Sequence, residues 1–130
     1  MLNENVVKVL KNNTWTVATC AAGVPNAVPV GFKDVTEDGK LVVGDVFLGT
    51  TMRNVLDNGK IAVSAYDAST SEGYQVKGTA AYVTEGPVVD TFKALAAKLF
   101  HGKMTAKGAI VITPEQVIVT TPGPENKKVL

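Results

Sequence analysis

The chain has 130 residues, enough for one domain around one core, and its 45% hydrophobic and 19% charged residues are typical of a globular fold. A formal net charge of +1 provides no strong field for nucleic acid, and no run of lysine or arginine indicates a membrane surface. The single cysteine, Cys20, excludes an internal disulfide, and without paired Cys/His clusters no metal site is expected.

The N-terminal segment predicts a short helix followed by a strand. Val6, Val7 and Leu10 recur at helical spacing within residues 3–11, and residues 14–22 are rich in threonine and valine. No apolar run is long enough for a signal peptide core or a membrane span, so we expect a cytoplasmic protein. Trp15, the only tryptophan, is expected to pack in the core.

The next segment predicts two strands. After a turn at residues 23–26, the strand at 27–32 is interrupted by Pro29, which is typical of an edge strand, a bulge or a break in pairing. The Asp-Gly pair within residues 37–40 predicts a hairpin turn, and the apolar run 41–48 predicts the following strand.

The second half of the chain predicts a helix, two strands, a longer helix and a final strand region. The elements are a helix at 50–57 that ends at Asn58-Gly59, strands at 60–67 and 74–84, a helix at 88–100, and one or two strands within 108–121. This pattern predicts a mainly β fold with flanking helices, built as a six- to seven-stranded antiparallel barrel, because closure removes exposed strand edges.

Polar residues gather where the strand at 41–48 gives way to the next helix. A helix N-terminus has free N–H groups and a dipole that favours anions, and Thr50, Thr51 and Arg53 add hydroxyl and guanidinium donors. A phosphate would fit there. The alternative is that a threonine caps the helix and Arg53 is solvated.

The sequence gives little support for the catalytic sites of hydrolases, kinases or metalloenzymes. The one histidine, His101, follows the helix at 88–100 and is interpreted as a solvated helix end. The chain has no Walker loop, no dinucleotide-binding glycine motif and no nucleophile elbow. Cys20 alternates with Thr16 and Ala18 and is interpreted as a small buried residue. No residue is therefore assigned a catalytic role.

The order and spacing of several stretches resemble the FMN-binding split-barrel family named for pyridoxamine 5′-phosphate oxidase, and most closely its small single-domain FMN-binding proteins. The stretches are WTVATCAAGVPNAVPVGF, EDGKLVVGDVF, TTMRNVLDNGKIAVSAYD and YQVKGTAAYVTEGP. The resemblance implies a single FMN-binding split-barrel domain over residues 1–130 that forms a homodimer, with one flavin per subunit near the interface.

The resemblance also implies a cofactor site. The matching residues would be Pro29, Val30, Gly31 and Phe32 along the flavin ring, main-chain groups near Phe47 and Leu48 at the ring or ribityl chain, and Thr50, Thr51, Arg53 and Asn54 at the phosphate. Many family members carry more positive charge at the phosphate position. Lys33 or Lys77 could supply it here.

The function implied is that of an FMN-dependent redox protein with a nicotinamide or protein electron donor. One alternative is a non-catalytic split-barrel module that binds FMN, haem or deazaflavin, and another is an interaction domain without a ligand. The C-terminal PGPENKKVL lacks the Arg- and His-bearing segment of true pyridoxamine phosphate oxidases, so we expect no oxidase activity on vitamin B6 compounds. Val129 and Leu130 either fray or cover the flavin of a partner subunit.

Overall fold

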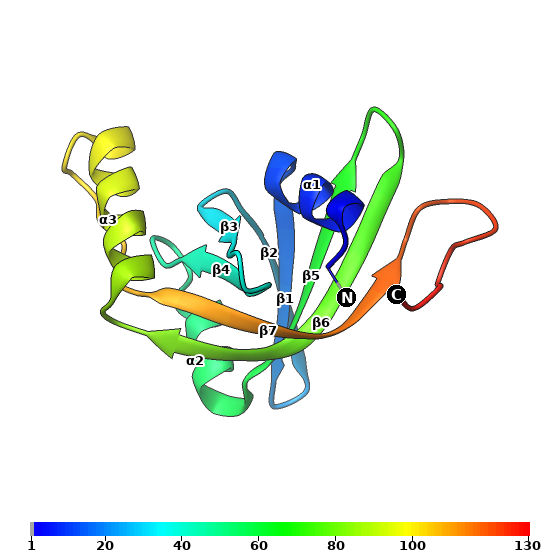
Figure 1. Ribbon diagram of the computed structural model, residues 1–130. Coiled ribbons are helices and arrows are strands. Elements are labelled where there is room, and N and C mark those ends of the chain that lie inside the picture. The colour runs from blue at the N-terminus through cyan, green and yellow to red at the C-terminus, as the bar shows by residue number, and fades with distance from the viewer. Residues whose placement is uncertain (1) are drawn as a thin grey trace.

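Seven antiparallel strands form one strongly curled sheet in the computed structural model, which describes residues 2–130 (Figure 1). The sheet order is β2-β1-β5-β6-β7-β4-β3. The strands are β1 (Trp15–Ala21), β2 (Val24–Val30), β3 (Lys33–Val35), β4 (Leu41–Gly44), β5 (Lys60–Asp67), β6 (Glu72–Val83) and β7 (Ala109–Val119). The edge strands β2 and β3 are joined by only Gly31 and Phe32, so the sheet curls back on itself. The predicted split β-barrel is confirmed.

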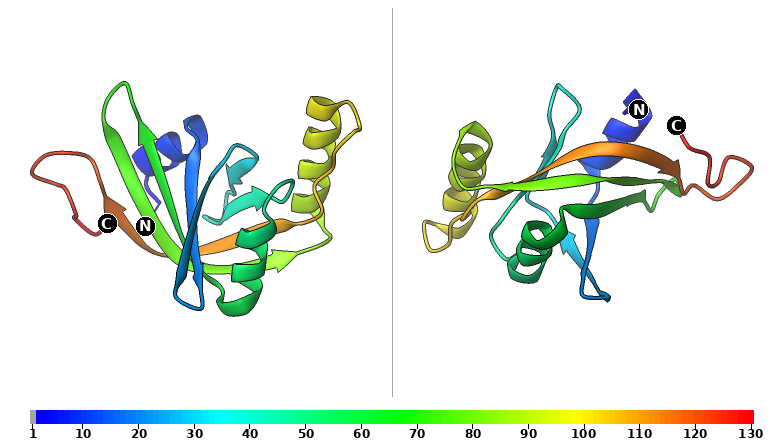
Figure 2. Two further views of the ribbon diagram at one scale, coloured as in Figure 1. Left: turned by 180° about the vertical axis from the view of Figure 1, so that it is seen from behind. Right: turned by 90° about the horizontal axis from the view of Figure 1, so that it is seen from below.

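Three helices flank the sheet: α1 (Glu4–Asn12), α2 (Gly49–Asn58) and α3 (Pro87–Phe100). Figure 2 shows α1 and α2 against the curled strands, whereas α3 stands at the far ends of β6 and β7. The Asn3 side chain caps α1 by accepting from the Val6 N–H at 3.0 Å, and Gly59 ends α2 with φ 68°. Among residues 2–130, none of the helices has the length and apolar character needed to cross a bilayer.

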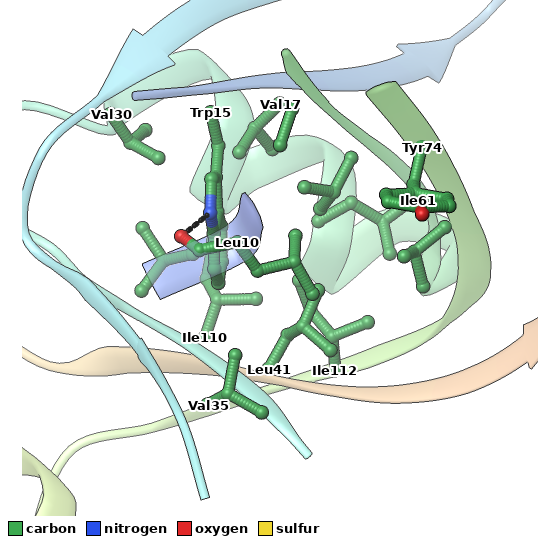
Figure 3. Close-up of a cluster of buried hydrophobic side chains, with 14 of the residues drawn as sticks. Leu10, Trp15, Val17, Val30, Val35, Leu41, Ile61, Tyr74, Ile110 and Ile112 are labelled. Carbon is green, nitrogen blue, oxygen red and sulfur yellow. Dashed lines mark hydrogen bonds between the residues drawn. The ribbon is translucent and has the colours of Figure 1, made fainter. Parts of the chain in front are cut away.

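The main core fills the inside of the curled sheet (Figure 3). Trp15 is fully buried there, and its Nε1–H donates to the carbonyl oxygen of Leu10 at 2.7 Å. The prediction that Trp15 packs in the core is confirmed. A second apolar cluster lies under α3 and includes Val89, Phe92 and Ala96. The helix α3 therefore packs on its own part of the sheet, near the β4 end.

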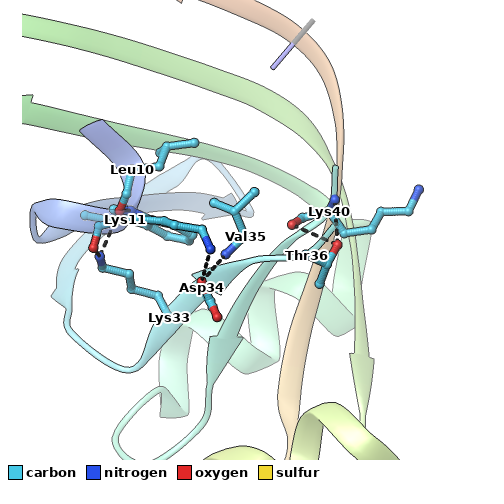
Figure 4. A network of polar contacts seen from close by, with 8 residues as sticks. Leu10, Lys11, Lys33, Asp34, Val35, Thr36 and Lys40 are labelled. Atoms are coloured by element: carbon cyan, nitrogen blue, oxygen red, sulfur yellow. Dashed lines mark hydrogen bonds and ion pairs between the residues drawn. The ribbon is translucent and has the colours of Figure 1, made fainter. Parts of the chain in front are cut away.

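Lys33 fastens α1 to β3 (Figure 4). Its Nζ donates to the carbonyl oxygens of Leu10 at 2.8 Å and Lys11 at 3.0 Å, at the C-terminal end of α1, and lies 5.4 Å from the Trp15 ring centroid. Burial lowers the pKa of Lys33. Because its ammonium group is bound to α1, Lys33 does not supply the extra positive charge expected at α2.

The structure corrects several expected boundaries. The predicted strand 41–48 ends at Gly44, because residues 45–48 form a turn stabilised by the Asp45 side chain. The hairpin turn after β1 is confined to Ala22 and Gly23, both with positive φ, so β2 begins earlier than expected. The short strand β3 was not predicted. The interpretation of Cys20 as buried is wrong: it lies on the exposed face of β1.

The C-terminal tail is joined to β7 of the same chain. Lys127 donates from its N–H to the Val119 carbonyl at 2.7 Å, and Leu130 donates to Val117 at 2.9 Å. Val129 forms a bridge with Ile118. The expectation that the last two residues fray is therefore wrong within one subunit. Whether they approach a partner's flavin stays a hypothesis, which deletion of both residues and measurement of flavin affinity would test.

Candidate functional site

A hollow of about 360 Å³ opens where the two edges of the sheet meet. Its lining comes from the end of β2 and the two residues after it, from the end of β4 and the turn after it, and from one residue of α3. The residues are Val28, Pro29, Val30, Gly31, Phe32, Gly44, Val46, Phe47, Leu48 and Leu99. The structure thus brings together six of the predicted residues, those at 29–32 and 47–48. The lining carries no charged side chain, so it suits a flat apolar group.

Aromatic side chains form one corner of this hollow. The Phe32 and Phe100 ring centroids are 5.7 Å apart, and Phe47 meets Phe100 edge to face at 6.2 Å. Phe47 is nevertheless 67% exposed and Leu99 56% exposed. This corner is therefore an apolar surface with an open rim.

Main-chain groups at the hollow differ in their availability. Strand β2 is an edge strand, as Pro29 predicts, so part of its main chain faces away from β1. Both main-chain groups of Leu48 are occupied, its N–H by Asp45 Oδ1 at 3.0 Å and its carbonyl by the Met52 N–H at 2.6 Å. The main chain of Phe47 makes no hydrogen bond within residues 2–130. Phe47 is thus better placed than Leu48 for a main-chain contact with a ligand.

The helix α2 begins at Gly49, directly after the lining residues Phe47 and Leu48, and no side chain caps its first turn. The alternative that a threonine caps the helix is therefore wrong. Thr50 and Arg53 are exposed, and Arg53 Nη2 donates to Thr50 Oγ1 at 3.0 Å. Free N–H groups, a hydroxyl and a guanidinium thus lie together at the N-terminal end of α2, the combination that favours a bound phosphate.

Thr51 and Asn54 lie on the opposite, buried side of α2. Asn26 Nδ2 donates to Thr51 Oγ1 at 3.0 Å, and Asn54 Nδ2 donates to Thr19 Oγ1 at 3.0 Å. Thr51 is 1% exposed and Asn54 8%. The four predicted phosphate residues therefore divide into an exposed pair, Thr50 and Arg53, and a buried pair that joins α2 to the β1–β2 hairpin. All four residues are polar and lie within five consecutive positions, so the sequence alone could not tell which pair is exposed and which is buried.

Lys77 lies elsewhere. It lines a shallow hollow on the outer face of the sheet together with Lys60 and Ala62. This hollow shares no lining residue with the one beside Phe47. Within one subunit, Arg53 is thus the basic residue at the start of α2.

Asp45 and Tyr82 were not identified from the sequence. Asp45 is 3% exposed, its Oδ1 accepts from the Leu48 N–H, and its Oδ2 accepts from the Tyr82 hydroxyl. Burial, and then the hydrogen bond to Asp45, raise the pKa of Tyr82. One signal was available, because Asp45 is the only charged residue in the apolar run 41–48.

The free energy of unfolding is expected to fall as the pH rises above 10, because two tyrosines hold their protons more tightly in the folded chain. Burial, followed by Glu72, raises the pKa of Tyr74 to about 12, and the pKa of Tyr82 is raised above its ordinary value of 10.0. Between the unfolded and folded pKa values the unfolded chain binds fewer protons, so the stabilisation is complete below pH 10 and is lost above it. Urea denaturation on both sides of this pH should show the decline, and Tyr74→Phe should make it shallower. An unchanged slope in Tyr74→Phe would contradict the assignment to Tyr74.

The curled sheet, the apolar hollow and the adjacent helix start define a small split-barrel protein with a candidate ligand site. The profile of the pyridoxamine 5′-phosphate oxidase family matches residues 2–122. The chain therefore belongs to this family of FMN-binding split barrels.

Several known proteins are similar to this chain over nearly its whole length. An uncharacterized protein of Methanocaldococcus jannaschii is 31% identical over 99% of this chain and 87% of its own. The structure of HupZ from Group A Streptococcus is similar with a TM-score of 0.81 at 28% identity, covering 96% of this chain and 98% of that one. An FMN-binding protein from Syntrophomonas wolfei shares the fold with a TM-score of 0.81 at 15% identity, covering 95% and 88%.

Proposed function

We propose that this protein binds FMN, with the flavin ring in the hollow beside Phe32 and Phe47 and the phosphate at the N-terminal end of α2. The observation that carries the proposal is the continuity of the two sites. Phe47 and Leu48 line the hollow, and Gly49, the next residue, begins the uncapped helix. FMN has the same order of parts, an apolar ring system at one end and a phosphate at the other.

FMN, when bound, supplies hydride and electron transfer, and the protein's part is to bind and orient it. The apolar lining would exclude water from the ring, while Thr50 and Arg53 would hold the phosphate. No side chain of the lining is an acid or a base, so we name none as catalytic. We therefore propose a cytoplasmic redox protein that takes electrons from a nicotinamide or a protein donor.

We also propose that the functional form is a homodimer. Phe47 and Leu99 are apolar side chains on the open rim of the hollow, with 67% and 56% of their surfaces exposed. A second subunit placed against this rim would remove that apolar surface from water and close the site. Sedimentation analysis of the purified protein should give twice the 13.6 kDa mass of one chain. A monomer that still binds FMN would contradict the dimer and leave the FMN proposal standing.

The second candidate is a module that holds a cofactor without turnover. Haem fits poorly, because the lining has no His, Cys, Met or Tyr side chain to ligate iron. A deazaflavin shares the flat ring and the phosphate of FMN and would fit the same residues. The lining thus favours a flavin-like ligand in either case.

Reconstitution with FMN tests the proposed function. The protein should bind FMN and show flavin absorption bands, and NADH or NADPH should bleach them. A protein that binds FMN but is not reduced by NADH or NADPH would favour an electron carrier with a protein donor or the non-catalytic module. A protein that binds no FMN would contradict the proposal.

Arg53→Ala should weaken FMN binding about tenfold, equivalent to about 1.4 kcal/mol, and leave riboflavin binding unchanged, because riboflavin lacks the phosphate. Fluorescence titration of both flavins measures the two affinities. Lys93→Ala is the matched control, since it removes one positive charge from an exposed position on α3. Equal losses for FMN and riboflavin would show that Arg53 does not contact the phosphate.

A further inference from the structure

The turn at residues 45–48 is held by a single buried side chain. Asp45 Oδ1 accepts from the Leu48 N–H at 3.0 Å, which closes the turn, and Oδ2 accepts from the hydroxyl of Tyr82 on β6. The main chain of Asp45 is also fixed: its N–H donates to the Gly108 carbonyl at 2.9 Å, and its carbonyl accepts from the Lys107 N–H at 2.8 Å. Asp45 therefore joins the turn to β6 and to the segment that enters β7.

Within residues 2–130 this carboxylate takes part in no ion pair. The ion pairs within residues 2–130 are Lys11–Asp34 and Lys128–Glu125, and both are exposed. A buried carboxylate without a cation is costly unless hydrogen bonds compensate it. Here the compensating donors are Leu48 and Tyr82, so the carboxylate is stable only while the turn keeps this conformation. The arrangement thus couples the side chain to the shape of the turn.

The neighbouring backbone leaves room for Tyr82 to reach Asp45. A Cβ atom added at Gly108 would lie 2.7 Å from the Tyr82 hydroxyl oxygen and 2.5 Å from the Val83 carbonyl oxygen. The glycine at this position lets the segment that enters β7 pass close to the tyrosine ring. The hydroxyl of Tyr82 can therefore reach the carboxylate of Asp45 beside the turn.

We propose that Asp45 and Tyr82 are a positioning pair for the ligand site. They set the turn so that Phe47 stands at the rim of the hollow and α2 starts at Gly49. This inference rests on the proposed FMN function. Asp45 takes the Leu48 N–H and leaves the following N–H groups of α2 for a phosphate, so one side chain fixes both ends of the site. Asp45 and Tyr82 act through the turn and do not themselves line the hollow.

Tyr82→Phe is the main test, because phenylalanine keeps the ring and removes only the hydroxyl. We expect FMN affinity to fall about tenfold, together with a changed visible circular dichroism spectrum of the bound flavin. Tyr74→Phe is the matched control. Tyr74 is also on β6 and donates to a carboxylate, Glu72 Oε2 at 2.6 Å, but it lies beside the C-terminal tail and away from the hollow. This control should change FMN affinity by less than about twofold.

Asp45→Asn and Asp45→Ala separate geometry from charge. Asparagine keeps an oxygen for the Leu48 N–H and places an amide beside the Tyr82 oxygen, so we expect it to retain FMN affinity within about threefold of the unchanged protein. Alanine removes both contacts and should lose at least as much affinity as Tyr82→Phe. Thermal unfolding of each variant shows that it is folded at the temperature of the titration.

The outcomes distinguish this inference from the proposed function. If the unchanged protein binds FMN and Tyr82→Phe binds it like Tyr74→Phe, the positioning role is wrong and the FMN proposal stands. If Asp45→Asn loses as much affinity as Asp45→Ala, the charge rather than the turn geometry matters, which also overturns the inference. An unchanged protein that binds no flavin would overturn both proposals.

Discussion

Replacing Trp15 with alanine is expected to lower the free energy of unfolding by about 4 kcal/mol. Trp15 has no exposed surface and lies at the centre of the main core, where it packs among residues from the helix α1 and from several strands. Truncation would leave a large cavity and remove the surface over which Lys33 is placed. Because domains of this size are stable by only about 5–15 kcal/mol, the variant should be near the limit of folding.

Urea denaturation followed by far-ultraviolet circular dichroism measures this loss, since the variant has no tryptophan fluorescence. Trp15→Phe is the control and should cost about 1.5 kcal/mol, because the ring volume is mostly kept. The Leu10 carbonyl would still accept from Lys33 Nζ at 2.8 Å, so no acceptor is left without a donor. A loss below about 1 kcal/mol in Trp15→Ala would contradict the central role of this side chain.

Features set by neighbouring residues could be predicted from the sequence. The alternation in β1 and β5, the Asp-Gly turn before β4 and the glycine after α2 all depend on contacts within a few residues. Pro29 left an edge strand, a bulge or a break in pairing open, because a proline cannot donate to a neighbouring strand, and the structure shows the first of these. These local signals were enough to predict an antiparallel barrel, whereas the split barrel and the two stretches that line the hollow were implied by the resemblance to the family.

Features that depend on distant contacts could not be predicted. The hydrogen bond from Tyr82 to Asp45 joins residues 37 positions apart, and that from Asn54 to Thr19 joins residues 35 apart. Alternation placed Cys20 on one face with Thr16 and Ala18, but it did not tell which face is buried. Which face of a strand or helix is buried depends on the tertiary packing, so the buried and exposed sides of α2 became distinct only in the structure.

The hollow itself offers a test that leaves the core untouched, because Gly31 lines it without filling it. Gly31 does not have a positive φ, and a Cβ atom added there would meet nothing within 4 Å. A side chain at this position is therefore free of backbone strain, and it should change the free energy of unfolding by no more than about 0.5 kcal/mol. A large apolar ring at residue 31 would instead cover the lining beside Phe32.

Gly31→Trp is accordingly expected to lower flavin affinity by about a hundredfold or more, equivalent to about 2.7 kcal/mol, with little change in stability. Gly31→Ala should bind FMN almost normally, since one methyl group occupies little of a hollow of about 360 Å³. FMN and riboflavin should be affected equally by the tryptophan, because it blocks the ring and not the phosphate; Arg53→Ala should affect FMN alone. Fluorescence titration of both flavins against all three variants therefore locates the two ends of the ligand separately. Normal FMN binding by a folded Gly31→Trp protein would place the flavin ring outside this hollow.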